Sequence, residues 1–170
     1  MVEITVREAQ PGDYATAGEV AVAAYRTIDP ELGAYEARLR DVAGRTTDAT
    51  VLVAVVGGRV VGTATYVPGP HSRLAESEER DDAGLRMLAV APDAGGQGIG
   101  TKLVAHALEL ARRARRRRLV LLTRPEMQAA HAVYARLGFM RAPGLDEAFD
   151  EVTLLGYART LDHPGVGEDS

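Results

Sequence analysis

Apolar and polar side chains follow two different periods along this chain, and each period predicts one kind of secondary structure. Short apolar runs, either alternating with polar residues or continuous, are typical of β-strands. Two such runs flank Gly57-Gly58, which predicts a β-hairpin, because glycine tolerates the backbone angles of a two-residue turn. The ranges with a strand pattern are 4–7, 50–56, 59–67, 85–91, 119–123, 139–141 and 151–157.

Other segments have apolar residues three and four positions apart, which is the spacing of one face of an amphipathic helix. Asp13 and Asp29-Pro30 are suitable starts for two of these segments, and Gly138 is a suitable end for another. Residues 70–84 are mostly polar and are predicted to form a long loop. The ranges with the helical pattern are 14–28, 30–44, 99–114 and 126–137.

This order of elements combines an antiparallel meander with one strand–helix–strand crossover, which runs from 85–91 through 99–114 to 119–123. Such a crossover joins parallel strands. The expected fold class is therefore α/β in the mixed α+β sense, with a central, mostly antiparallel sheet of six or seven strands flanked by four helices. At 170 residues the chain suits one domain, expected over 1–161, with a flexible tail over 162–170.

The composition limits the kinds of protein and of catalytic chemistry that fit this chain. With 46% hydrophobic and 26% charged residues, the chain has the composition of a soluble globular protein. Because it contains no cysteine, disulfides, thiolate metal sites and a cysteine nucleophile are excluded, and no metal is expected. No signal peptide or membrane-spanning run is visible, which predicts a cytoplasmic protein without a membrane partner.

The strongest charge feature is the basic run from Arg112 to Arg118. Such a run could bind nucleic acid or another acidic partner, but a net charge of -4 argues against a general nucleic-acid binder. Cations at a helix C-terminus oppose the helix dipole, Glu109 is spaced to pair with Arg112 and Arg113, and no aromatic residues for base stacking are interleaved. We therefore favour a structural role for the run and expect no nucleic-acid partner.

Residues 85–107 place a glycine-rich loop between a predicted strand and a predicted helix. Without side chains the backbone can approach a ligand closely, and the free amides of a helix's first turn favour phosphate groups. The loop differs from a P-loop, because Thr101-Lys102 stands where Lys-Ser/Thr is required. It also lacks the acidic residue that a Rossmann fold places at the end of its second strand. The glycines of the loop are Gly95, Gly96, Gly98 and Gly100.

Two blocks resemble a known family. The run Leu88-Ala-Val-Ala-Pro92 with the glycine loop resembles the acyl-CoA-binding motif of the GNAT superfamily of N-acetyltransferases, Arg/Gln-x-x-Gly-x-Gly/Ala. The run Ala129-Ala-His-Ala-Val-Tyr-Ala-Arg-Leu-Gly-Phe139 resembles that family's A-x-x-L-Y-x-x-x-G-F segment. The chain departs from the family pattern at Gly95, where Arg or Gln is usual, and at Met127, where Asn is common. The resemblance implies a GNAT-like fold and an acyl-CoA-dependent N-acyltransferase with acetyl-CoA as its cosubstrate.

The resemblance also implies roles for individual residues. The main chain of Leu88, Ala89 and Val90 would pair with pantetheine, as an added strand would. Tyr134 aligns with the tyrosine that the family uses as general acid for the leaving thiolate. The alternative for Tyr134 is a boundary tyrosine whose ring lies in the core and whose hydroxyl is exposed to water. The loop residues whose backbone amides would hold the pyrophosphate are Gly95, Gly96, Gln97, Gly98, Ile99, Gly100 and Thr101.

Several assignments stay open at this point. His131 could relay a proton to Tyr134, but we favour a partly exposed polar residue. Arg136 is a candidate for contact with the 3′-phosphate of CoA. The base that deprotonates the amine is not identified, and water is one alternative. The side chains considered for this role, in the segment before the 85–91 strand, are Glu78, Glu79, Asp81 and Asp82.

The expected reaction is direct attack of a primary amine on acetyl-CoA in a ternary complex. The acceptor is expected to be a small-molecule amine, an amino acid or a peptide N-terminus. The sequence does not identify the acceptor or the range of acyl-CoAs used. A homodimer is possible but not assigned. A catalytically silent acyl-CoA-binding or sensor domain is the alternative, and it would bind CoA without acceptor-dependent thiol release. A nucleic-acid-binding module built on the arginine run would instead bind in a strongly salt-dependent way.

Overall fold

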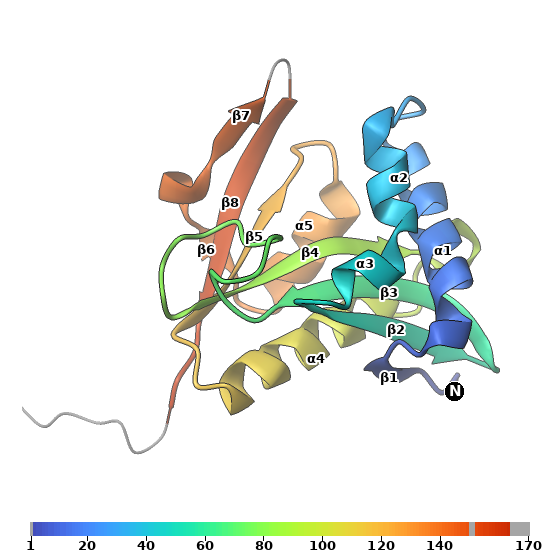
Figure 1. The fold of residues 1–170 in the computed structure, drawn as a ribbon, viewed down its shortest axis with the longest axis horizontal. Coiled ribbons are helices and arrows are strands. Elements are labelled where there is room, and N and C mark those ends of the chain that lie inside the picture. Colours follow the sequence, from blue (N-terminus) through green and yellow to red (C-terminus); the bar gives the residue numbers. More distant parts are fainter. Residues whose placement is uncertain (1, 150–151, 164–170) are drawn as a thin grey trace, which may run out of the picture.

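The computed structural model describes residues 2–149 and 152–163, which form an eight-stranded sheet with helices on both faces (Figure 1). The strands follow the order β1-β2-β3-β4-β5-β8-β6, and β7 pairs with β8 beside this path. Neighbouring strands are antiparallel except β4 and β5, which run parallel. The strands are β1 (Thr5–Glu8), β2 (Thr50–Val56), β3 (Arg59–Val67), β4 (Asp82–Val90), β5 (Arg118–Thr123), β6 (Met140–Arg141), β7 (Glu147–Phe149) and β8 (Val152–Thr160).

The α-helices in the described residues are α1 (Tyr14–Arg26), α2 (Ala34–Arg40), α3 (Val42–Arg45), α4 (Ile99–Arg113) and α5 (Gln128–Arg136). Helix α1 packs on β3 and β4 with α2 beside it, whereas α4 packs on the opposite face of the same strands (Figure 1). This arrangement confirms the predicted mixed fold class. No helix in the described part of the chain combines the length and the apolarity needed to cross a membrane.

The packing of α4 explains where the glycine loop lies. Ile99, Leu103 and Ala107, predicted to face the sheet, are at most 1% exposed. Gly62 of β3 lies against Ile99 and Leu103, and a Cβ atom at Gly62 would be 2.7 Å from Ile99 Cγ2 and 3.0 Å from Leu103 Cδ1. Because only glycine leaves room for this approach, the first turn of α4 lies directly on the sheet. The loop before α4 is thereby fixed beside the end of β4.

The β2–β3 hairpin has the predicted bounds on both strands. Gly57 and Gly58 both have positive φ angles, 56° and 77°, as a type I′ turn requires. This prediction succeeded because hairpin pairing depends on residues that are adjacent in the sequence.

The predicted helix over 30–44 is wrong in part. Helix α2 begins only at Ala34, after Gly33 with its positive φ of 57°. Asp41 then ends α2 and accepts a hydrogen bond from the backbone N–H of Gly44 at 2.9 Å, so it caps a new helix, α3. Five helices therefore flank the sheet in the described residues, where four were predicted.

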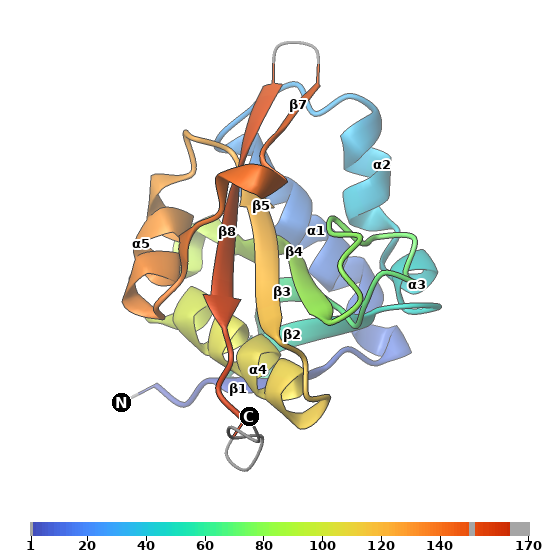
Figure 2. The ribbon, with the colours of Figure 1, turned by 90° about the vertical axis from the view of Figure 1, so that its left-hand side faces the viewer.

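Two strand predictions also need correction. Strand β4 begins at Asp82, three residues earlier than predicted, because Asp82 pairs in register with Arg118 of β5. Strand β7 lies in a segment that showed no strand pattern, and Figure 2 shows it beside β8. The sheet therefore has eight strands in place of six or seven. Residues 164–170 of the predicted tail lie outside the described residues, and the extent of the domain stays a prediction.

Candidate active site

Strands β4 and β5 separate part-way along the sheet. Their parallel pairing runs from Asp82 and Arg118 to Leu85 and Leu121, whereas β4 itself continues to Val90. Beyond Leu85, β4 has no strand neighbour on that side within the described ranges. An unpaired strand edge presents backbone N–H and C=O groups that an extended ligand can pair with.

A β-bulge lies where the strands separate. On β3, Thr63 pairs with Ala89 and Thr65 pairs with Arg86, so two residues of β4 face one residue of β3. One of the two is Met87, whose φ is +54°. A non-glycine residue in this region of backbone space costs roughly 1–3 kcal/mol, and such outliers cluster at functional sites. The bulge bends β4 at the start of its free edge.

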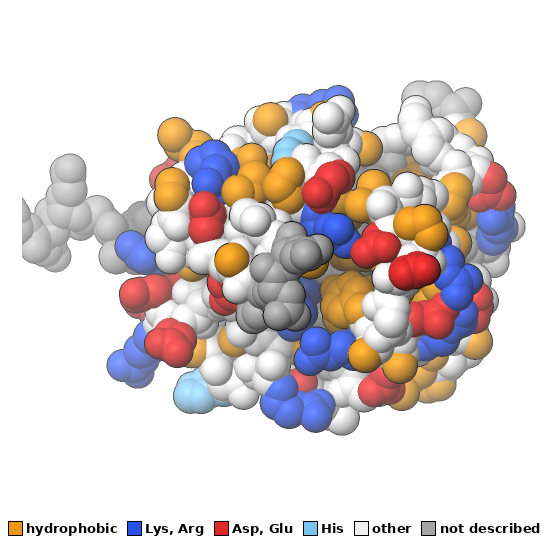
Figure 3. All heavy atoms as spheres, turned by 90° about the horizontal axis from the view of Figure 1, so that it is seen from above, with side chains coloured by type: hydrophobic (Ala, Val, Ile, Leu, Met, Phe, Trp, Pro, Cys, Tyr) orange, Lys and Arg blue, Asp and Glu red, His pale blue; other side chains and the backbone are white. Residues whose placement is uncertain are grey.

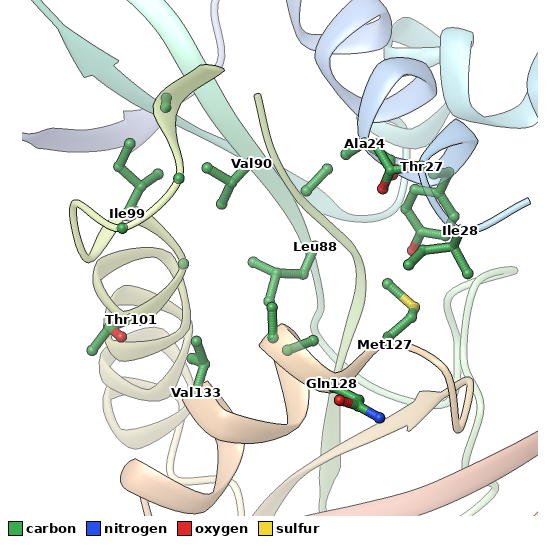
Figure 4. Close-up of a pocket in the computed structure, with 18 of the residues that line it drawn as sticks. Ala24, Thr27, Ile28, Leu88, Val90, Ile99, Thr101, Met127, Gln128 and Val133 are labelled. Carbon is green, nitrogen blue, oxygen red and sulfur yellow. The ribbon is translucent and has the colours of Figure 1, made fainter. Parts of the chain in front are cut away.

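A cavity of about 560 Å³, which we call the cofactor cavity, lies beside this free edge (Figure 4). The only charged side chains in its wall among the described residues are Glu126 and Arg136, and both are exposed. The cavity is therefore lined mainly by apolar side chains and by backbone. The lining residues labelled in Figure 4 are Leu88 and Val90 of β4, Ile99 and Thr101 of α4, Ala24 of α1 with Thr27 and Ile28 after it, and Met127, Gln128 and Val133 at α5.

The glycine loop contributes backbone to one end of the cofactor cavity. Gly96 and Gly98 have φ angles of +79° and +78°, and a Cβ atom at either position would meet no atom within 4 Å. Gly98 is the N-cap of α4, and no side chain caps that helix. The amides of its first turn are therefore available to a ligand, and the helix dipole favours an anion there.

Nearly all of the predicted cofactor residues meet in this cavity. Gln97 is the exception: it is exposed and does not contribute to the wall. Arg136 also lines the cavity, with Nη1 3.5 Å from Thr101 Oγ1, which places its charge near the glycine loop. The predicted residues in the wall are Leu88, Ala89, Val90, Gly95, Gly96, Gly98, Ile99, Gly100 and Thr101.

A second cavity of about 490 Å³, which we call the acceptor cavity, is lined by residues of α1, α2, β4, β5, β7 and β8. Figure 3 shows a hollow with hydrophobic side chains at its floor and acidic and basic side chains around it. Tyr25 and Met127 belong to the walls of both cavities. The two cavities are therefore neighbours.

Glu76 is the functional candidate that sequence analysis missed. It lines the acceptor cavity, its side chain is only 16% exposed, and Oε1 lies 3.6 Å from Arg86 Nε. Burial raises the pKa of Glu76 to about 7, although the positive charge of Arg86 opposes the shift. A carboxylate that titrates near neutral pH suits a general base. Nothing in the sequence marks Glu76 among the acidic residues around it.

None of the four residues that the sequence offered as a general base lies in the acceptor cavity. Glu78, Glu79 and Asp81 are exposed and contribute to neither cavity wall. Asp82 is buried, but it accepts hydrogen bonds from Arg118 Nε at 2.8 Å and from the Ser77 hydroxyl at 2.7 Å. Asp82 therefore joins β4 to β5 and is not a base.

Tyr134 lies where the two cavities meet. It lines a small cavity of about 20 Å³ whose wall shares Leu88 with the cofactor cavity and Thr123 with the acceptor cavity. Its ring packs on Phe139 with 5.6 Å between centroids, so the ring belongs to the core as the alternative interpretation expected. Burial, and then the nearby charge of Glu76, raise the pKa of Tyr134. The phenol therefore keeps its proton at neutral pH, and the same shift makes donation of that proton to a thiolate less favourable than for an exposed tyrosine.

His131 supports structure and does not reach the cavities. Its Nε2 lies 3.0 Å from the backbone oxygen of Arg124, and its ring packs on Tyr157 with 5.7 Å between centroids. It lines none of the three cavities. These contacts favour a structural role over the proton relay. No group of three or more His, Asp or Glu side chains in the described residues could hold a metal ion.

The basic run from Arg112 to Arg118 makes structural contacts. Arg112 and Arg113 each lie within 3.8 Å of Glu109, as predicted. Arg116 donates to the backbone oxygen of Arg80, and Arg118 pairs with Asp82. The run lines none of the three cavities, and these contacts favour the structural interpretation.

A family model described as the acetyltransferase (GNAT) family matches residues 17–139, which is more than half of the chain. An uncharacterized N-acetyltransferase of Methanocaldococcus jannaschii is 36% identical over 87 residues. That match covers 51% of this chain and 37% of the relative, so the chain spans little more than a third of its length.

Two solved structures from Brucella melitensis have similar folds. The ribosomal-protein-alanine N-acetyltransferase has a TM-score of 0.69 at 25% identity, with 92% of this chain and 99% of that chain covered. A GNAT family acetyltransferase in complex with acetyl-CoA has a TM-score of 0.62 at 26% identity, with 94% of this chain and 92% of that chain covered.

Proposed function

The chain belongs to the GNAT family of acetyltransferases, and on this premise we propose that it transfers an acetyl group from acetyl-CoA to a primary amine by direct attack in a ternary complex. The observation that carries the proposal is the junction of two cavities at Tyr134. Two substrates held on either side of this junction would meet there without a covalent enzyme intermediate.

The cofactor cavity fits the chemistry of a nucleotide-linked thioester. The open space before Gly96 and Gly98 and the uncapped start of α4 suit a diphosphate. The free edge of β4 from Leu88 to Val90 suits the amides of pantetheine, and the mainly apolar walls suit its carbon chain. These features support acetyl-CoA as the cosubstrate.

Glu76 is the proposed general base and Tyr134 the proposed general acid. As the amine nitrogen attacks the thioester carbonyl, the Glu76 carboxylate takes the proton that nitrogen loses. The carbon–sulfur bond then breaks, and the Tyr134 hydroxyl gives its proton to the thiolate. Proton return from Glu76 to Tyr134 through solvent restores both groups. The products are an amide and free CoA thiol.

An acceptor screen tests the proposal. Purified protein is incubated with acetyl-CoA and a panel of amines, amino acids and peptides, and free thiol is measured over time. We expect thiol release that depends on the acceptor, with acetylated product of the same amount by mass spectrometry. CoA binding in calorimetry without acceptor-dependent release for any panel member would support the silent binding domain instead.

A further inference from the structure

The acceptor cavity carries as many cationic as anionic side chains. Two carboxylate–guanidinium pairs within the wall neutralise four of these charges, and one charge of each sign has no ion-pair partner among the described residues. One unpaired charge of each sign suits a ligand that itself carries both. The acidic residues in the wall are Asp29, Glu76 and Glu147, and the basic residues are Arg38, Arg86 and Arg124.

Two of the three arginines already have partners. Arg86 pairs with Glu76 at 3.6 Å and donates to the backbone oxygen of Leu74 at 3.2 Å. Arg124 lies 3.3 Å from Asp29 and 3.4 Å from Glu126. These pairs fix both guanidinium groups to neighbouring protein oxygens.

Arg38 differs from the other two. Within residues 2–149 and 152–163 its side chain makes no ion pair and no hydrogen bond. It projects from α2, is exposed and lines the acceptor cavity. A guanidinium group at the edge of a cavity, with its donors uncommitted, is suited to a carboxylate.

The inner part of the cavity contains a second uncommitted polar group. Thr123 is 3% exposed, and its Oγ1 atom has no hydrogen-bond partner among the described residues. It borders both the acceptor cavity and the junction that contains Tyr134. A buried hydroxyl without a partner is costly, and a ligand amine could supply that partner. Glu76 offers a second acceptor in the same cavity.

The remaining wall of the acceptor cavity is largely apolar. It includes Leu32, Tyr35, Met87, Val152 and Leu154. A cavity of about 490 Å³ has room for a side chain of leucine or phenylalanine size in addition to the polar ends. An apolar side chain would contact this wall without leaving a polar group unpaired.

We propose that the acceptor is a free amino acid with an apolar side chain, whose amine faces Glu76 and Thr123 and whose carboxylate faces Arg38. This inference rests on the proposed acetyl transfer and specifies its substrate class. The carboxylate would orient the acceptor, and the two amine hydrogens would be held by Glu76 and Thr123, which leaves the nitrogen lone pair for the thioester.

The test compares L-leucine, L-leucinamide and spermidine as acceptors, at saturating acetyl-CoA and pH 8. The amine of the amide is less basic and so is more often neutral, which favours the amide unless the carboxylate is recognised. We expect kcat/KM for L-leucine to exceed that for L-leucinamide by about tenfold or more. Arg38→Gln should abolish this preference by lowering kcat/KM for the acid only.

Arg40→Gln is the matched control, because Arg40 lies on the same helix and pairs with Glu19 and Glu36 outside the cavity. It should leave the preference for the acid unchanged. Equal use of acid and amide, or a preference for spermidine, would overturn the inference while the proposed function stands.

Calorimetry distinguishes a wrong substrate class from a wrong assignment of acetyl transfer. L-leucine is titrated into the protein saturated with CoA, for wild type and for Arg38→Gln. Binding of L-leucine that Arg38→Gln weakens, in a protein without turnover on any acceptor, would support the substrate class and contradict acetyl transfer. No binding and no turnover of L-leucine, with turnover of other amines, would contradict the substrate class alone.

Discussion

The two cavities that meet at Tyr134 are lined by different kinds of chemical groups. The cofactor cavity is formed largely by the free edge of β4, the glycine loop and the first turn of α4, with only Glu126 and Arg136 as charged lining residues. The acceptor cavity has six charged lining residues, and they come from segments spread between Asp29 and Glu147. One cavity offers backbone to a ligand, and the other offers side chains.

The difference between the two cavities suggests that the acceptor cavity determines which acceptor is used. Backbone donors recognise a diphosphate or an amide whatever the side chains are, so the cofactor cavity can keep its ligand while the sequence varies. Side chains that converge from distant segments can change one at a time, and each change alters the acceptor that fits. We therefore expect cofactor binding to depend on glycines and acceptor chemistry to depend on charged residues.

Removing the charge of Glu76 should have the largest effect on turnover. We expect Glu76→Gln to lower kcat about 10²- to 10³-fold, because the proposed base is lost, with acetyl-CoA affinity unchanged. Glu78→Gln is the control, since Glu78 is exposed and outside both cavities. Steady-state kinetics of thiol release would measure both. Wild-type turnover in Glu76→Gln would mean that the acceptor cavity does not supply the general base.

Filling the glycine loop should have the largest effect on cofactor binding. Gly98→Val places a β-branched side chain at a φ of +78° in front of the α4 amides, and we expect acetyl-CoA affinity in calorimetry to fall about 100-fold. Gly58→Val has the same backbone strain, φ +77°, in the β2–β3 turn, so it controls for lost stability. Equal affinity of the two variants would contradict a phosphate site at the loop.

Tyr134→Phe tests the junction between the cavities. We expect kcat to fall about 10- to 100-fold with unchanged acetyl-CoA affinity, because the thiolate would leave without a proton from the phenol. Tyr157→Phe is the control, since Tyr157 lies 6.4 Å from Tyr134 between ring centroids but lines none of the cavities. If both variants turn over like wild type, Tyr134 has only a packing role.

Glu76 should also couple activity and stability to pH in opposite directions. Activity needs the ionised carboxylate, so the slope of log kcat/KM against pH should increase by about one below the pKa of about 7, in addition to the slope that protonation of the acceptor amine gives. Because the folded-state pKa is raised, the uncharged form favours folding, and stability is greatest below the ordinary carboxyl pKa and declines up to about pH 7. We expect a decline of about 3 kcal/mol, from a shift of roughly 2.5 pH units. Denaturation curves of wild type and Glu76→Gln at pH 5 and pH 8 measure it, and identical pH dependence in the two proteins would contradict it.

The smallest effect on activity is expected at Asp82, which lies outside both cavities. Asp82→Asn should lower the free energy of unfolding by about 2 kcal/mol, because Arg118 loses a charged partner at the start of the β4–β5 pairing. Turnover per folded molecule should not change. Asp81→Asn, at an exposed position, should alter neither quantity. Loss of turnover in Asp82→Asn under folded conditions would mean that this pair also shapes the site.

Features that depend on residues close together in the chain could be predicted from the sequence. The β2–β3 hairpin followed from Gly57-Gly58, and the glycine loop before α4 followed from one contiguous segment, because turns and helix starts are formed by residues close in the chain. The choice between Asp82 and Glu76 did not follow, since both are acidic residues of one polar stretch.

The folded chain was needed to show that Asp82 is buried against Arg118 and that Glu76 lines the acceptor cavity. The side chains that line the cavity together with Glu76 come from α1, α2, β4, β5, β7 and β8, and no local sequence pattern predicts that convergence. A raised pKa is a property of that surrounding protein and not of the residue itself. For this reason the β4 and glycine-loop residues that line the cofactor cavity could be named from the chain alone, whereas the residues that line the acceptor cavity required the folded molecule.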